Sequence, residues 1–181
     1  MVEVTIAEPG ELGAAQLAAA EALVRSAFGA NFRAHDWLHA VDGVHVVLTD
    51  AAALVAFAAV VPRTLHHNGR ALDTGYVEGV AVRADQQGRG LGSAVMDQAE
   101  AVIRARHQFG ALNAVESAAE FYAGRGWQLW TGHTQAVNPS GGTVDTYDDA
   151  DRIYLLNPAQ QHQTLDTGLP LSCDWRIGDL W

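Results

Sequence analysis

The chain lacks lysine altogether, so all 11 of its basic side chains are arginine. A Walker-type phosphate loop requires a lysine followed by serine or threonine, and this class of nucleotide-binding loop is therefore excluded. Cysteine occurs once, as Cys173, which excludes a disulfide within the chain. A single cysteine also favours a reducing, cytoplasmic compartment. We expect Cys173 to be a buried structural thiol rather than a nucleophile.

The N-terminal residues also lack a basic segment and a long apolar run, and we expect neither a signal peptide nor a membrane span. Positive charge is scarce, because 21 acidic side chains give a formal net charge of -10. Nucleic acids and anionic membranes favour basic surfaces, so neither is expected as a partner. An acidic surface would instead attract a cationic small molecule.

The length of 181 residues and the hydrophobic content of 49% suit one globular domain over residues 1–181. Hydrophobic periodicity predicts a mixed, mostly antiparallel α/β sheet flanked by helices. We expect a hairpin turn at Asn68-Gly69, a capping box at Ser117 that starts a helix, a loop over 138–146, and little regular structure after Asn157. The predicted strands are 2–7, 44–48, 54–65, 71–83, 111–113, 127–137 and 153–156, and the predicted helices are 11–28, 32–41, 91–107 and 117–122.

A glycine-rich segment, Gln87-Gly88-Arg89-Gly90-Leu91-Gly92, lies between a predicted strand and a predicted helix. Glycines let several backbone N–H groups point at one spot at the positive end of the helix dipole, which suits a phosphate. A dinucleotide fingerprint would need a last glycine where the chain has Ser93. The remaining pattern, Q-x-x-G-x-G, resembles the acetyl-CoA pyrophosphate loop of the GNAT superfamily of N-acetyltransferases. The alternative is a glycine-rich helix start that binds no ligand.

Three further segments resemble the aminoglycoside 2′-N-acetyltransferases of that superfamily, namely residues 75–83, 121–127 and 173–181. The last of these, with the pattern D-W-R-x-G-D-x-W, is the most specific, because other acetyltransferases of the superfamily do not share it. The resemblance covers nearly the whole chain. It implies a GNAT fold, a substrate-binding C-terminal tail, acetyl transfer from acetyl-CoA to the 2′-amine of an aminoglycoside, no metal, and a homodimer.

The resemblance also implies roles for individual residues. Glu78 would act as the base through a water molecule, and Tyr122 as the acid that protonates the leaving thiolate. The backbone of Val80 and Val82 would bind the pantetheine arm. The implied acetyl-CoA-binding residues are Val80, Ala81, Val82, Gln87, Gly88, Arg89, Gly90, Leu91 and Gly92. The implied substrate-binding residues are Asn31, Asp36, Gly79, Asn113, Asp148, Asp149, Asp179 and Trp181.

The residue types themselves fit this chemistry. A protonated amine cannot attack a thioester, so some group must accept its proton, and a carboxylate such as Glu78 can do so through water. Glu78 lies among apolar strand residues, where a carboxylate is costly unless it is paired or functional. A structural ion pair is its alternative role. Tyr122 can donate a proton to a thiolate, and packing on the sheet is its alternative role.

Aspartates and tryptophans are interspersed toward the C-terminal end. Carboxylates bind ammonium groups and indoles cover the apolar faces of sugar rings, so this region suits a cationic aminosugar. We expect Asp145 and Asp166 to be ordinary surface residues, and the side chain of Trp181 to dock against the protein rather than lie in solvent. In relatives we expect an aspartate at Asn31 and a serine at Asn113, so these two positions affect which substrates are accepted.

Other interpretations remain open. The same fold could acetylate another amine, such as a cell-wall amino sugar or a polyamine, or bind acyl-CoA as a regulatory module without turnover. His35 and His39 are spaced like two ligands of a zinc site, but no clear third ligand follows, and we expect no metal.

Overall fold

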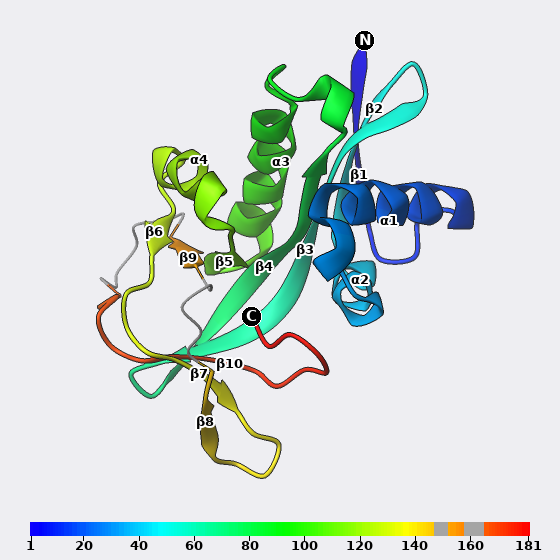
Figure 1. Ribbon diagram of the computed structural model, residues 1–181. Helices are drawn as coiled ribbons and strands as arrows, with labels where there is room; N and C mark the ends of the chain where they lie inside the picture. The colour runs from blue at the N-terminus through cyan, green and yellow to red at the C-terminus, as the bar shows by residue number, and fades with distance from the viewer. Residues whose placement is uncertain (147–151, 158–164) are drawn as a thin grey trace. The chain divides into compact units, whose positions relative to one another are not determined.

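The structure is a computed structural model and describes residues 1–146, 152–157 and 165–181. The chain, drawn as a ribbon in Figure 1, divides into two compact units, Met1–Val61 with Val77–Val102 and Pro62–Tyr76 with Ile103–Trp181. Three elements contribute residues to both units, namely β3 (Ala53–His67), β4 (Arg70–Val82) and α3 (Leu91–Arg106). The organisation as a single domain stays a prediction.

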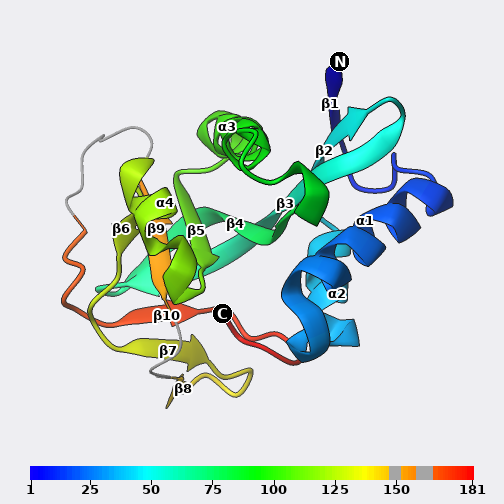
Figure 2. The ribbon, with the colours of Figure 1, turned by 45° about the horizontal axis from the view of Figure 1, so that its top comes forward.

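The first unit contains β1 (Val2–Ala7) and β2 (Val44–Asp50), with the first part of β3. β1 pairs with β2, and β2 with β3, in antiparallel register. The helices α1 (Ala14–Phe28) and α2 (Ala34–Val41), whose ribbons are drawn in Figure 2, contribute apolar side chains to one core with β2 and β3. Within this core, the rings of Trp37 and Phe57 lie 5.8 Å apart. The strands and helices that the sequence predicts in this unit are present, although some of their bounds differ.

Helix α1 begins later than the sequence predicts, at Ala14 rather than residue 11. The side-chain oxygen of Gln16 accepts a hydrogen bond of 3.0 Å from the backbone N–H of Gly13. This contact caps the first turn and fixes Gly13 as the residue that precedes the helix. A short 3-10 helix, Gly29–Asn31, separates α1 from α2.

The second unit holds most of the remaining strands. β5 (Phe109–Asn113) runs parallel to the first part of β4 and antiparallel to β9 (Ile153–Leu156), which also pairs with β6 (Gln128–Leu129). The helix α4 (Ala119–Gly124) precedes β6. Together with the pairs of the first unit, these ladders confirm the predicted mixed, mostly antiparallel sheet.

Three further strands of the second unit differ from the prediction. β10 (Leu171–Cys173) pairs antiparallel with β3 and parallel with β7 (Thr134–Val137), and β7 pairs with β8 (Thr143–Asp145). The predicted loop over 138–146 was therefore wrong at β8, and β10 lies in the tail where low periodicity gave no strand prediction. Both strands have only three residues, which is too short for periodicity to show.

Two other predictions in this unit were wrong. The strand over 127–137 is divided between β6 and β7, because Trp130 turns inward and its indole N–H donates to the carbonyl of Leu169 at 2.9 Å. The capping box at Ser117 does not start a helix. Ser117 lies inside a 3-10 helix, Glu116–Ala118, and Ala118 precedes α4 without a side-chain cap.

The hairpin at Asn68-Gly69 is confirmed, with both residues in the left-handed region at φ values of 48° and 72°. Within the described residues, no helix combines the length and the hydropathy that crossing a membrane requires.

Candidate functional site

The predicted site residues belong to both units, and each group is described by itself. Asp36, Glu78 and the segment 79–92 lie in the first unit, whereas Asn113, Tyr122 and the segment 173–181 lie in the second. Asp148 and Asp149 lie outside the described residues. Asn31 ends a 3-10 helix, and its side chain also lies outside what the structure describes.

A backbone kink in β4 follows Glu78 directly. Gly79 has a φ of +62° in the middle of the strand, a conformation that glycine adopts without strain. A Cβ at this position would lie 3.5 Å from the Val24 side chain, an ordinary contact, so the backbone conformation is what calls for glycine. An irregular residue of this kind redirects the side chains beside it, and such kinks are frequent next to active sites. Glu78 is half-buried, between the buried Val77 and this kink.

The strand then continues as Val80-Ala81-Val82. Ala81 is buried in the core of the first unit, whereas Val80 and Val82 are partly exposed. This alternation places Val80 and Val82 on the face opposite the core. The carbonyl of Val82 accepts a hydrogen bond from the side-chain amide of Gln87 at 3.4 Å. Gln87 therefore ties the glycine-rich segment to the end of β4.

The glycine-rich segment forms the N-terminus of α3. Gly88 and Gly90 have φ values of +74° and +79°, both are exposed, and α3 begins at Leu91, whose side chain is buried. The carbonyl of Gly90 accepts the first helical hydrogen bond, from Ala94 at 3.0 Å. The N–H groups of the first turn have no acceptor within a helix and stand at the positive end of its dipole. The predicted glycine turn at a helix N-terminus is confirmed, and its geometry suits a phosphate.

Charged side chains flank this turn. Arg83 donates to both carboxylate oxygens of Asp85, at 2.6 and 3.2 Å, and these hydrogen bonds lower the pKa of Asp85. Arg89 donates instead to the neutral amide oxygen of Gln86. The guanidinium of Arg89 lies next to the two left-handed glycines in the chain, and its charge also helps to lower the pKa of Asp50. A basic group at that place favours a bound anion.

Asp36 has two structural partners within α2. One carboxylate oxygen accepts a hydrogen bond of 2.7 Å from the backbone N–H of Arg33, which caps the helix, and the other lies 3.1 Å from a ring nitrogen of His35. The sequence alone predicted a substrate-binding role for Asp36 and gave no sign of this capping role. The substrate-binding role stays a prediction.

In the second unit, Tyr122 is enclosed by aromatic rings. It is 7% exposed, and the rings of Phe121, Trp127 and Tyr154 lie 5.1, 6.1 and 6.0 Å from it. Burial raises the pKa of Tyr122 to about 12, because a phenolate is poorly solvated there. The phenol therefore stays protonated throughout the neutral range and can act as a donor.

Asn113 ends β5 and is used to join two strands. Its side-chain oxygen accepts a hydrogen bond of 3.0 Å from the backbone N–H of Arg152, the residue before β9. The backbone N–H of Ala114 donates back to the carbonyl of Arg152 at 3.0 Å. The amide of Asn113 thus extends the ladder between β5 and β9, and its role in substrate binding stays a prediction.

The segment after β10 carries Asp179 and Trp181. The side chain of Trp181 is buried, with the residue 3% exposed, and its indole N–H donates to the hydroxyl of Thr146 at 2.7 Å. The expectation that Trp181 docks against the protein is confirmed. Asp179 is exposed, and one of its carboxylate oxygens accepts a hydrogen bond of 3.2 Å from the backbone N–H of Trp181.

Two residues near this segment were missed by the sequence analysis. Arg63 and Tyr76 are both buried, and the guanidinium carbon of Arg63 lies 4.8 Å from the centre of the Tyr76 ring. The available signal was Arg63 itself, the one charged residue in the predicted strand 54–65. Cys173, by contrast, behaves as expected: it is buried, and burial raises the pKa of its thiol to about 11.

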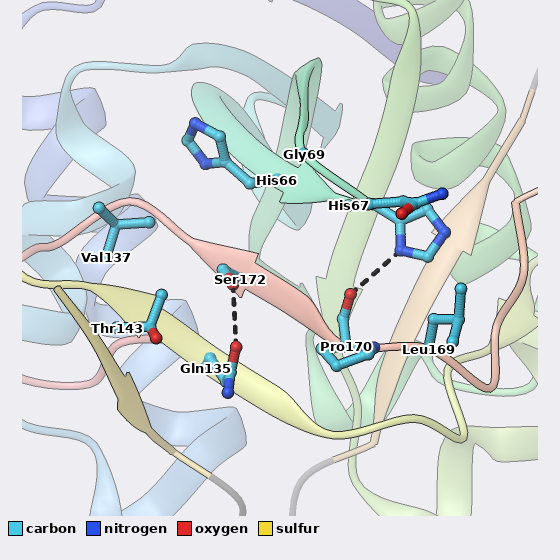
Figure 3. Close-up of a pocket in the computed structure, with 10 residues that line it drawn as sticks. His66, His67, Gly69, Gln135, Val137, Thr143, Leu169, Pro170 and Ser172 are labelled. Atoms are coloured by element: carbon cyan, nitrogen blue, oxygen red, sulfur yellow. Dashed lines mark hydrogen bonds between the residues drawn. The ribbon is translucent and has the colours of Figure 1, made fainter.

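A hollow of about 480 Å³ lies beside the hairpin of β3 and β4 in the second unit (Figure 3). His67 and Ser172 line it, held by hydrogen bonds to the Pro170 carbonyl and the Gln135 side chain, respectively. None of the predicted catalytic or binding residues is among the residues that line this hollow.

Comparison with known proteins identifies the family. Residues 11–130 match the model of the acetyltransferase (GNAT) domain. The chain is 43% identical over 162 residues to the aminoglycoside 2′-N-acetyltransferase of Mycolicibacterium fortuitum, covering 90% of this chain and 83% of that protein.

Solved structures agree on the fold. ElaA of Escherichia coli is 19% identical with a TM-score of 0.64, covering 86% of this chain and 98% of ElaA. An acyl-CoA N-acyltransferase of Pseudomonas aeruginosa is 18% identical with a TM-score of 0.63, covering 86% of this chain and 99% of its own. The chain therefore has the GNAT fold and belongs to the GNAT family of acetyltransferases, whose members use acetyl-CoA.

Proposed function

We propose that this protein transfers an acetyl group from acetyl-CoA to the 2′-amine of an aminoglycoside. The binding of acetyl-CoA is supported by one observation, the pair of exposed left-handed glycines, Gly88 and Gly90, at the N-terminus of α3. The proposal of an aminoglycoside as the substrate is supported by the 43% identity to an aminoglycoside 2′-N-acetyltransferase. A cytoplasmic location and a homodimer are part of the same proposal.

In this proposal the first unit holds the cofactor and removes a proton. The N–H groups of 88–92 and the guanidinium of Arg89 hold the pyrophosphate, and the backbone at Val80 and Val82 holds the pantetheine arm. Acetyl-CoA supplies the acetyl group as a thioester; the amine forms the new C–N bond, the C–S bond breaks, and CoA leaves as a thiolate. Glu78 accepts the proton of the substrate ammonium through a water molecule, so that the neutral amine can attack.

The second unit contributes the acid and the amine-binding residues. The neutral phenol of Tyr122 donates a hydrogen bond to the sulfur as negative charge develops there. Asp179 carries a negative charge on an exposed carboxylate and pairs with a substrate ammonium, and the segment around Trp181 supports it. Asn31, Asp36, Gly79, Asn113, Asp148 and Asp149 complete the proposed substrate contacts.

The direct test measures the release of free CoA thiol from acetyl-CoA with a panel of amines. The panel contains aminoglycosides with and without a free 2′-amine, polyamines and cell-wall amino sugars. Release only with the 2′-amino compounds would establish both the reaction and its position. Turnover with a polyamine or an amino sugar alone would replace the proposed substrate, and tight acetyl-CoA binding without turnover would favour a regulatory module.

The glycine turn gives a second test, Gly90→Ala. We expect acetyl-CoA to bind about tenfold more weakly, because alanine is strained at this left-handed position and its Cβ stands where the ligand must approach the backbone. Isothermal titration with acetyl-CoA measures the change.

Gly10→Ala is the matched control for this test. Gly10 has a φ of +84° and open space around its Cβ position, like Gly90, but it follows β1 and lies outside the loop. It should lose similar stability and keep its affinity for acetyl-CoA. If the Gly90→Ala variant and the unmodified protein bind acetyl-CoA equally well, the glycine-rich loop is not part of the cofactor site.

A further inference from the structure

One side chain from β3, that of Arg63, binds both ends of the segment that follows β10. Arg63 has a side chain only 3% exposed, and its Nε donates to the carboxylate of Asp174 at 2.8 Å. Its Nη2 donates to two backbone carbonyls, that of Asp174 at 3.0 Å and that of Leu180 at 2.9 Å. A single guanidinium therefore binds the start and the end of the segment 174–180. Those contacts join residues that lie 111 and 117 positions apart in the chain.

Two further contacts hold the same segment. The carbonyl of Leu180 also accepts a hydrogen bond from the thiol of Cys173 at 3.3 Å. Because the raised pKa of that thiol, about 11, keeps its proton in place, the contact persists through the neutral range. The Leu180 carbonyl thus has two donors, and Trp181 follows it with a buried indole bound to Thr146.

The ring of Tyr76 supports this arrangement. The guanidinium carbons of Arg63 and Arg176 lie 4.8 and 5.5 Å from the centre of the Tyr76 ring. Arg176 belongs to the segment and its Nε donates to the carbonyl of Asp179 at 2.6 Å. Cation–π contacts therefore connect Arg63 through Tyr76 to the backbone of Asp179.

An arginine is required for this geometry. Its planar fork presents donors at fixed angles, so three acceptors can be bound from one side chain. Lysine carries the same charge on a single ammonium and cannot reproduce the fork. The charge itself is buried, so its hydrogen-bond partners also offset the cost of removing it from water.

We propose that Arg63 is a positioning residue for the amine substrate, which acts by holding Asp174 and Leu180 so that Asp179 and Trp181 are presented in one fixed arrangement. The inference rests on the proposed function, which assigns Asp179 and Trp181 to amine binding. Without this contact each binding event would have to order the segment, and the entropy lost in doing so would reduce the affinity for the amine substrate. In this proposal Arg63 acts through the segment and is not itself a catalytic residue.

The test is Arg63→Lys, measured by steady-state kinetics. We expect the KM for the aminoglycoside to rise by about tenfold or more, because several hydrogen bonds to a buried charged group are lost. The KM for acetyl-CoA and the kcat at saturating amine should stay near those of the unmodified protein. Asp174→Ala, on the partly exposed side of the contact, should shift the same KM in the same direction by less.

Leu72→Ala is the control for a merely structural effect. Leu72 is buried in the apolar core of the second unit, which also contains Tyr76 and Cys173, and its side chain has no group that could hydrogen-bond to the segment. It should lower the melting temperature without a selective rise in the KM for the amine. An unchanged amine KM in Arg63→Lys, or a loss matched by Leu72→Ala, would overturn the proposal.

A second readout separates this inference from the proposed function. The indole N–H signal of Trp181 in a ¹⁵N spectrum, assigned by its loss in Trp181→Phe, reports on the segment without any substrate. We expect Arg63→Lys to shift or broaden this signal and to leave that of Trp127 in place. If the unmodified protein acetylates no aminoglycoside, the proposed function fails. An unchanged Trp181 signal in Arg63→Lys would separately show that Arg63 does not hold the segment.

Discussion

Glu78→Gln should lower kcat by about 100-fold to 10,000-fold near neutral pH, the usual contribution of a general base. The glutamine keeps the size and polarity of the side chain but cannot accept the proton of the substrate ammonium. The glycine turn is unchanged, so the affinity for acetyl-CoA should be retained. The deficit should shrink as the pH rises, because an amine that is already deprotonated needs no base.

Glu21→Gln is the control for Glu78→Gln. Glu21 is a carboxylate of α1 in the same unit, paired with Arg25 at 2.8 Å on a partly exposed surface, and such pairs contribute little. Its loss should leave kcat unchanged across the pH range. A Glu78→Gln variant with the kcat of the unmodified protein would show that Glu78 is not the base.

Tyr122→Phe should lower kcat by about 100-fold while the KM for the amine changes little. The raised pKa, about 12, keeps the phenol protonated, so its O–H can donate to the sulfur as negative charge develops there. Phenylalanine has no such donor. Single-turnover measurement of the chemical step tests this.

The same residue predicts a pH dependence of stability. Because the folded pKa of Tyr122 is raised from 10.0 to about 12, the folded state favours the neutral phenol. Its contribution is fully present below pH 10 and is lost as the pH rises toward 12, by about 1.4 kcal/mol per unit of pKa shift. Tyr122→Phe should lose less stability than the unmodified protein over this interval in urea titrations. Identical losses would contradict the burial of the phenol.

Local sequence signals predicted the parts of the fold that short-range rules control. The Asn68-Gly69 hairpin and the turn before α3 depend on left-handed residues, which glycine and asparagine mark directly. Long apolar runs gave the central strands. The short strands β8 and β10 depend on partners that are distant in the chain, and a segment of three residues carries no detectable period.

The same division applies to the candidate site. The glycine turn was predicted because it belongs to a recognisable local pattern between one strand and one helix, whereas the role of Glu78 came from the family resemblance and stays a prediction. Arg63 acts on residues 111 and 117 positions away, which no local pattern encodes. Asp36 and Asn113 were found as candidates, but their hydrogen bonds to backbone N–H groups could be known only from the structure.

The burial of Cys173 has a practical consequence for enzymology. CoA release is measured with disulfide reagents that react with thiolates, and a protein with an accessible cysteine adds its own colour to the signal. Here the one thiol of the chain is buried, has a raised pKa and donates to the carbonyl of Leu180. The folded enzyme should give almost no background, so slow variants such as Glu78→Gln can be assayed at high protein concentration. A colour that appears only after denaturant is added would report that the thiol is protected in the folded state.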